Sequence, residues 1–163
     1  MLTFIVSFIL LSWIYLSWTQ RNNPRAKKID REWQVLLLSG SFIAAGGLLV
    51  WRITSAEQNS ITINVVATAY AIIGSILRAL GIHALGQHFS WGSIPPKEIV
   101  CSGVYRYIKH PLIIGYVLQT VGMSIAGNGS YVIRTLPIIC VIIAAWVQIR
   151  REEREIRRCF ENY

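Results

Sequence analysis

The sequence is poor in acidic residues and in cysteines, and it lacks the common nucleotide-binding loops. Its 163 residues include 8 Asp and Glu against 16 Lys and Arg. The three cysteines, Cys101, Cys140 and Cys159, form no CxxC pair, so we expect reduced thiols and no metal site. A P-loop, a GxGxxG loop and a Ser/His/Asp grouping are also missing from the sequence. The familiar nucleotide-fold and hydrolase classes are therefore excluded.

Apolar residues are abundant and gathered in blocks. They make up 53% of the chain, and the mean hydropathy is +0.46, too high for a soluble domain of this size. The net charge of +8 does not indicate nucleic-acid binding, because the basic residues lie between the apolar blocks. We therefore predict an all-α integral membrane protein with a single membrane domain over residues 1–163.

Five apolar blocks predict five transmembrane helices. These blocks cover residues 2–18, 33–51, 61–85, 111–126 and 131–149. The first follows Met1 without a basic region or a cleavage site, so we predict a retained helix and not a signal peptide. The fourth is short for a span, and the turn signal at 128–130 predicts that it forms a helical hairpin with the fifth.

Two of the blocks contain residues that bear on helix packing. Small residues in the second block predict close helix contact, and these are Gly40, Ala44, Ala45, Gly46 and Gly47. Arg78 lies inside the third block, where a buried charge is costly. Because it is near the end of the block, we expect its guanidinium to extend to the membrane interface.

The basic residues predict the orientation of the chain. Five lie in residues 21–31, three in residues 86–110 and five in residues 150–163, whereas the opposite loops contain none. By the positive-inside rule the N-terminus lies outside and the C-terminus in the cytoplasm. Residues 86–110 and the tail then share the cytoplasmic face, and we expect a prokaryotic inner membrane.

The stretch 103–111 gathers Tyr, Arg, Lys and His directly before the fourth block. Pro111 suits the first position of a helix, because its missing N–H costs nothing there. The helix start behind His110 would favour a carboxylate or a phosphate. The alternative is a juxtamembrane loop of aromatic and basic anchors.

The tail adds a carboxylate to this picture. If the fifth helix continues, Ile149, Glu153, Ile156 and Phe160 fall on one stripe. A carboxylate within an apolar stripe should meet a cation. That cation is either one of the protein's own (Arg106, Lys109 or Arg78) or the ammonium group of a ligand. We therefore predict a cytoplasmic pocket for a zwitterion between the 86–110 segment and the C-terminal helix.

Several motifs together resemble a known family. They are Leu85-Gly-Gln-His-Phe89, Gly103-Val-Tyr-Arg-Tyr-Ile-Lys-His-Pro111, Gly115 and Arg150-Arg-Glu-Glu-Arg-Glu-Ile156. This combination is similar to the isoprenylcysteine carboxyl methyltransferases, integral-membrane enzymes that use S-adenosyl-L-methionine. The resemblance implies a methyltransferase core in residues 61–163, preceded by two N-terminal helices in residues 1–60.

The resemblance also implies roles for individual residues. It assigns binding of S-adenosyl-L-methionine to Tyr105, Arg106, His110, Pro111, Gly115, Glu152 and Glu153. Arg150, facing the acceptor, and Glu153 are the expected catalytic residues. The acceptor implied is a lipophilic or prenylated molecule that enters from the bilayer, with a carboxylate as the group methylated. Membrane lipids are the other expected partners, and neither a metal nor nucleic acid is implied.

Val104, Lys109 and Ile113 stand where the family usually has Pro, Arg and Tyr, which leaves the class of acceptor open. A phenol, thiol or amine of a lipid-like molecule would need a base, and His110 or Glu153 would be the candidates. Two other classes stay open at this point. One is a membrane reductase with a nicotinamide cofactor, and the other is a non-enzymatic membrane interaction protein.

Overall fold

A computed structural model describes residues 33–55, 60–89, 102–127 and 129–161. All regular secondary structure in these ranges is helical, which confirms the all-α class for this part of the chain. The long helices are α2 (Trp33–Ser55), α3 (Ile61–Leu85), α4 (Pro111–Ala126) and α5 (Tyr131–Glu161), and the 3-10 turns are η1 (Gly86–His88) and η2 (Gly103–Arg106). The predicted first span, 2–18, lies outside the described residues, so five spans remain a prediction.

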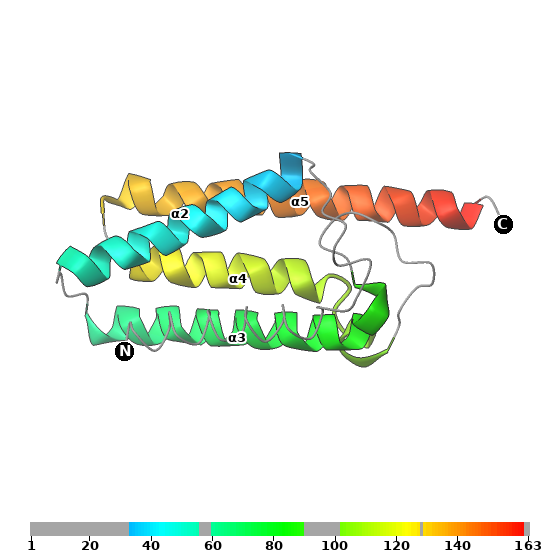
Figure 1. The fold of residues 1–163 in the computed structure, drawn as a ribbon, viewed down its shortest axis with the longest axis horizontal. Coiled ribbons are helices and arrows are strands. Elements are labelled where there is room, and N and C mark those ends of the chain that lie inside the picture. Colours follow the sequence, from blue (N-terminus) through cyan, green and yellow to red (C-terminus); the bar gives the residue numbers. More distant parts are fainter. Residues whose placement is uncertain (1–32, 56–59, 90–101, 128, 162–163) are drawn as a thin grey trace.

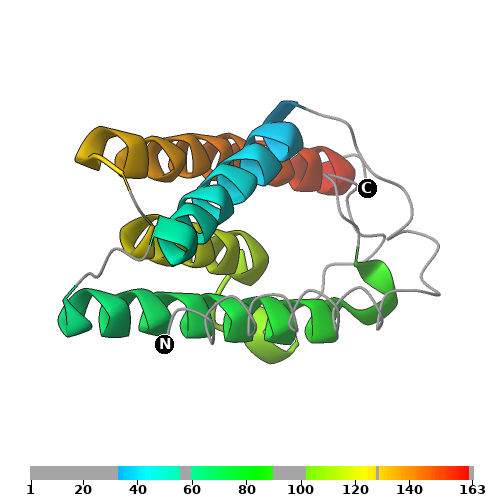
Figure 2. The same ribbon diagram turned by 60° about the vertical axis from the view of Figure 1, so that its left-hand side comes forward.

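The four long helices form a bundle (Figure 1). α3 and α4 lie side by side in opposite directions and make the most extensive contact, while α5 packs against α2 and α4. α2 crosses the other helices obliquely, as the turned view shows (Figure 2). The C-terminal part of α5 extends beyond the ends of α3 and α4, on the side where η1 lies (Figure 1).

Among the described residues, two stretches are long and apolar enough to cross a membrane. They are α3, with 25 residues, and Tyr131–Arg154 of α5, with 24 residues. α4 has 16 residues and is the shorter apolar helix that the sequence predicts. Large apolar side chains are exposed on α3 and α5, among them Ile61 at 76% and Leu136 at 61%. Such surfaces suit a lipid environment, where apolar side chains carry no penalty.

α3 and α4 touch through their backbones at two glycines. A Cβ atom at Gly74 would lie 2.6 Å from the carbonyl oxygen of Gly115, and a Cβ atom at Gly115 would lie 2.6 Å from that of Gly74. Gly122 makes a second close approach, since its Cβ would lie 2.8 Å from the oxygen of Ala67. Small residues of this kind allow helices in membranes to pack closely.

The small residues of α2 were predicted to make such contacts too, and among the described residues its glycines do not make them. A Cβ atom at Gly40, Gly46 or Gly47 would meet nothing within 4 Å among the described residues. α2 instead buries Ala45 and Leu49, which are one helical turn apart. The helical period, and not residue size, determines which side of α2 faces the bundle.

The prediction that Arg78 extends to the interface was also wrong. Its side chain is 2% exposed, and Nη1 donates to Oε1 of Gln119 at 2.6 Å. Nε2 of Gln119 in turn donates to Oγ of Ser75 at 2.6 Å, and the guanidinium lies 5.0 Å from the ring centre of Tyr116. Gly115 explains why the side chain of Arg78 points into the bundle, because a Cβ atom at residue 115 would lie 2.7 Å from Cγ of Arg78. The missing side chain leaves room for the arginine to turn inward.

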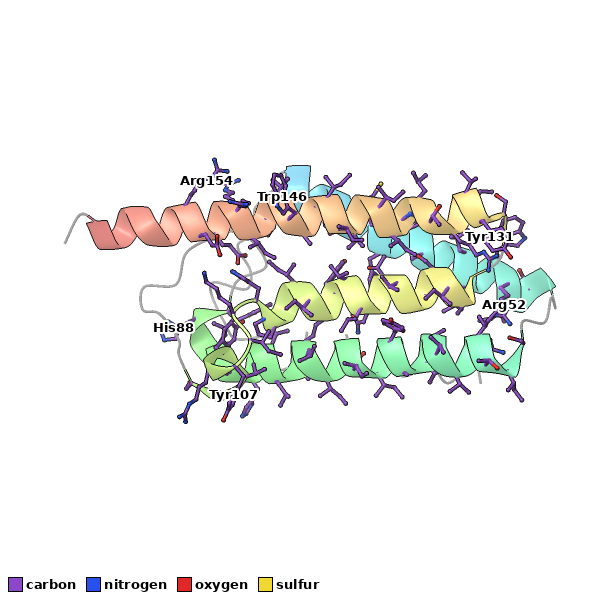
Figure 3. The ribbon with its side chains drawn as sticks, turned by 180° about the vertical axis from the view of Figure 1, so that it is seen from behind. Arg52, His88, Tyr107, Tyr131, Trp146 and Arg154 are labelled. Carbon is purple, nitrogen blue, oxygen red and sulfur yellow. The ribbon has the colours of Figure 1, made fainter. Side chains whose placement is uncertain are left out.

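A second buried arginine joins three helices at the other end of the bundle. Arg52 of α2 donates to the carbonyl oxygen of Ala126 at 2.6 Å and to Oδ1 of Asn64 at 3.1 Å. A cation is favourable at a helix C-terminus, where carbonyl groups lack helical partners. Figure 3 shows Arg52 far from His88 and Tyr107, which mark the end of the bundle that carries the predicted site.

Candidate functional site

α4 begins where the sequence predicts. Pro111 is its first residue and is buried, and His110 precedes it in the capping position. The side chain of His110 makes no capping hydrogen bond, so it does not satisfy the free amides of its own helix. It is directed to α5 instead, as the contacts described below show.

The turn η2 brings the predicted motif to this point. Gly103 has a φ of +60°, which favours glycine, and its Cα lies so close to α3 that a Cβ would be 3.3 Å from Cβ of Ala84. The amides of Tyr107 and Ile108 both donate to the carbonyl oxygen of Val104. The folded turn therefore holds the residues before Pro111 against the end of α3.

α5 supplies the acidic half of the site. The helix continues without a break to Glu161, which confirms the predicted continuation beyond residue 149. Nδ1 of His110 lies 3.1 Å from Oε2 of Glu152, and Nζ of Lys109 lies 2.8 Å from Oε1 of Glu153. Segments about 40 residues apart are thus joined by polar and charged side chains. The side chains of Ile156 and Phe160 lie outside the described residues.

Glu152 has a further partner in its own helix. Nε2 of Gln148 donates to Oε1 of Glu152 at 3.1 Å, and Gln148 is 5% exposed. We call Lys109, His110, Gln148, Glu152 and Glu153 the interhelical cluster. It joins the start of α4 to the part of α5 that follows its apolar segment.

The hydrogen bonds of the cluster indicate where His110 carries its proton. An ionised carboxylate only accepts hydrogen bonds, so Nδ1 of His110 is the donor to Glu152. Nε2 is buried and has no hydrogen-bond partner among the described residues. Its distance of 3.9 Å to Oε1 of Glu153 is too long for a hydrogen bond. Buried polar atoms are nearly always paired, so Nε2 is suited to bind a ligand.

Tyr105 lies next to the cluster and keeps its proton. Burial, and secondarily the charge of Glu152, raises the pKa of Tyr105 above its ordinary value. A phenolate would be poorly solvated and repelled by the carboxylate. The phenol is therefore a hydrogen-bond donor at neutral pH.

Comparison with known proteins identifies the family. Residues 65–158, more than half of the chain, match the isoprenylcysteine carboxyl methyltransferase (ICMT) family. The chain belongs to the ICMT family. No curated protein and no solved structure matches it. The matched range runs from α3 to the last turns of α5, so it includes every member of the interhelical cluster.

Within this ICMT-family chain, the structure brings together only some of the predicted site residues. His110, Glu152 and Glu153 meet, Pro111 follows His110 as the first residue of α4, and Tyr105 is close to Glu152. Tyr105 belongs to η2, His110 and Pro111 are the cap and the first residue of α4, and the two glutamates belong to α5. The family resemblance was necessary to select them, but the contact between α4 and α5 was also predicted from charge and helical period.

Three other predicted residues lie elsewhere. Gly115 is in the α3–α4 contact, where it faces the backbone of α3. Arg106 is exposed, and its guanidinium lies 6.0 Å from the ring centre of Tyr107. Arg150 is exposed as well, 5.5 Å from the ring centre of Trp146. Figure 3 shows Trp146 on the side of α5 that faces away from α4.

Two members of the cluster were not among the predicted site residues. Lys109 was considered only as one possible protein partner of Glu153, and that pairing is confirmed. Gln148 was missed altogether. Its position four residues before Glu152 is the signal that was available, since such residues are neighbours on a helix.

Proposed function

We propose that this protein transfers a methyl group from S-adenosyl-L-methionine to the carboxylate of a lipophilic acceptor, such as a prenylated cysteine. Membership of the ICMT family supports methyl transfer, and the family's name denotes an isoprenylcysteine carboxyl acceptor. The observation that carries the proposal is the buried Nε2 of His110, which has no hydrogen-bond partner among the described residues and lies 3.9 Å from Oε1 of Glu153.

The residues of the cluster fit the amino-acid end of this cofactor. Its carboxylate would be held by the free amides at the positive end of α4 and by the cation of Lys109. Its ammonium group would donate to Glu153 and to the unprotonated Nε2 of His110. Tyr105 contributes a neutral donor beside the cluster, and Pro111 fixes the start of α4, where its missing N–H costs nothing. Glu152 acts on this site through His110.

The chemistry that the bound cofactor supplies is a methyl group on a sulfonium. A carboxylate acceptor is already ionised at neutral pH, so the protein need not provide a base. The task of the chain is to align the reacting groups and exclude water. We propose that Arg150 leaves the ring of Trp146 to orient the acceptor carboxylate with two parallel N–H groups. Arg106 is the second exposed arginine available for this role.

The arrangement in the membrane follows from the helices. The exposed apolar faces of α3 and α5 contact lipid, and the charged part of α5 begins at Arg150, at the end of the bundle that carries the cluster. By the positive-inside rule this end faces the cytoplasm. The acceptor then enters from the bilayer, close to the point where the cluster leaves the apolar region. A prokaryotic inner membrane is our proposed location.

A second candidate function differs only in the acceptor. A histidine whose Nδ1 is fixed by a carboxylate presents Nε2 as a base. His110 has this arrangement with Glu152. A thiol, phenol or amine on a lipid-like molecule would then lose its proton to Nε2 before accepting the methyl group.

The experiment that separates the two uses the full chain in lipid nanodiscs. The protein is incubated with S-adenosyl-L-methionine labelled in the methyl group and with a farnesylated cysteine derivative or a lipid extract. We expect an apolar product whose label is released by mild base, as a methyl ester requires. A base-stable product would establish the second candidate, and the absence of any methylated apolar product would refute both. His110→Ala should abolish the activity, and Glu153→Gln should lower it when S-adenosyl-L-methionine is limiting.

A further inference from the structure

The adjacent carboxylates of Glu152 and Glu153 on α5 differ in their hydrogen-bond partners. Oε1 of Glu152 accepts from Gln148 at 3.1 Å, and Oε2 accepts from Nδ1 of His110 at 3.1 Å. Both partners are well covered, since the side chain of His110 is 12% exposed and Gln148 is 5% exposed. The carboxylate of Glu152 is therefore held at both oxygens by groups that have little freedom to leave.

Glu153 is held much less firmly. Its hydrogen bond among the described residues is to Nζ of Lys109, whose side chain is 71% exposed. An exposed lysine has a flexible stem and competes poorly with water, so such pairs contribute little to stability. The ammonium of an incoming molecule can take the place of Lys109 on this carboxylate at small cost.

We infer that Gln148 and Glu152 are positioning residues for His110, whereas Glu153 alone is the carboxylate that exchanges its cation for that of the ligand. Gln148 orients Glu152, and Glu152 keeps the proton of His110 on Nδ1. Nε2 is thereby directed to the space beside Glu153. The assignment of the ligand to Glu153 rests on the proposed function, but the assignment of Gln148 and Glu152 to His110 does not.

Nuclear magnetic resonance of ¹⁵N-labelled histidine tests the positioning half without any ligand. The sequence has 3 histidines, and long-range spectra show which ring nitrogen carries the proton in each. His83 and His88 serve as internal controls, because neither is bonded to the cluster. The spectra are recorded for the full chain in nanodiscs, in alkaline buffer where an ordinary histidine is neutral.

Four variants are compared with the parent chain. Gln148→Met keeps the length of the side chain but removes the donor, and Gln148→Arg restores a donor of sufficient reach. In the parent chain we expect the proton of His110 to be on Nδ1. In Gln148→Met and in Glu152→Met it should be divided between the two ring nitrogens. In Gln148→Arg it should return to Nδ1. Glu153→Gln should leave it on Nδ1. A loss of folding would instead alter all three histidines.

The ligand half is tested by calorimetric titration with S-adenosyl-L-methionine. Glu153→Gln should weaken binding by about tenfold or more, the effect expected when a charged hydrogen bond is lost. Lys109→Met should weaken it less, because Lys109 releases Glu153 on binding. If Gln148→Met leaves His110 unchanged, or if Glu153→Gln moves its proton, the positioning assignment is overturned. If the parent chain binds no S-adenosyl-L-methionine, the proposed function fails while the histidine result stands.

Discussion

Arg78 of α3 and Gln119 of α4 form a hydrogen bond of 2.6 Å in the interior of the bundle. The bond lies next to the contact of Gly74 with Gly115, where the two helix backbones touch. Polar side chains thus join the same pair of helices that glycines bring together. The α3–α4 pair supports the start of α4, and with it the position of His110.

Replacing Gln119 by Leu should destabilise the bundle by about 1–3 kcal/mol, because the guanidinium loses this acceptor in a buried place. The free energy of unfolding is measured by denaturant titration in detergent. Arg78→Met combined with Gln119→Leu should cost less than the sum of the two single changes, since residues in contact are not additive. Additive effects would show that the bond contributes nothing.

Gly74→Ala and Gly115→Ala should each destabilise the protein by about 1–3 kcal/mol, the usual cost of overpacking. The added methyl group would meet a backbone oxygen that cannot move aside. Gly47→Ala on α2 is the matched control, because its Cβ meets nothing within 4 Å among the described residues. It should be neutral or stabilising by up to about 1 kcal/mol, from helix propensity. Equal thermal shifts for all three changes would contradict the backbone contact.

Arg150→Lys should lower kcat/KM for the acceptor by about tenfold or more and leave the KM for S-adenosyl-L-methionine nearly unchanged. Lysine keeps the charge but cannot bind a carboxylate with two parallel N–H groups, which are worth more than one. Initial rates with each substrate varied in turn measure both constants. Arg134→Lys is the control, because Arg134 lies beside Tyr131 at the opposite end of the bundle (Figure 3). A change confined to the cofactor constant would place Arg150 at the cofactor.

The raised pKa of Tyr105 predicts a loss of stability in alkaline solution. An ordinary tyrosine ionises near pH 10, so above about pH 10 the unfolded chain releases a proton that the folded chain retains. The contribution of Tyr105 to the free energy of unfolding is complete below that pH. It falls as the pH rises toward the pKa of Tyr105 in the folded chain. Unfolding free energies measured between about pH 9 and 11 should therefore decrease less steeply in Tyr105→Phe than in the parent chain. Identical slopes would argue against a buried phenol.

Much of the helical layout was predictable from the sequence because it depends on local signals. The predicted ranges 61–85 and 111–126 coincide with α3 and α4, since apolar blocks define their extent and Pro111 defines a start. The positive-inside rule and the continuation of α5 predicted that the start of α4 and the tail lie on one side, and Lys109 was among the predicted partners of Glu153. Their distances and partners required the folded chain.

The failures concern contacts that depend on two helices at once. Arg78 turns inward because residue 115 of another helix has no side chain, and nothing near Arg78 in the sequence reveals this. The glycines of α2 looked suitable for close packing, yet the crossing of α2 directs them away from its described neighbours. Gln148 acquires a role only because Glu152 faces His110. Hydropathy and helical period contain no information of this kind.

The backbone contact of Gly74 with Gly115 has a mechanical consequence for the cluster. Where two main chains already touch, no side chain remains to be compressed or rearranged, so one wall of the cluster is stiff. The facing wall is α5, whose ion-pair contacts with His110 in the described part of the chain come from Glu152 and Glu153. The extra volume for a bound ligand must therefore come from displacement of α5. That displacement would also move the lipid around the apolar segment of α5.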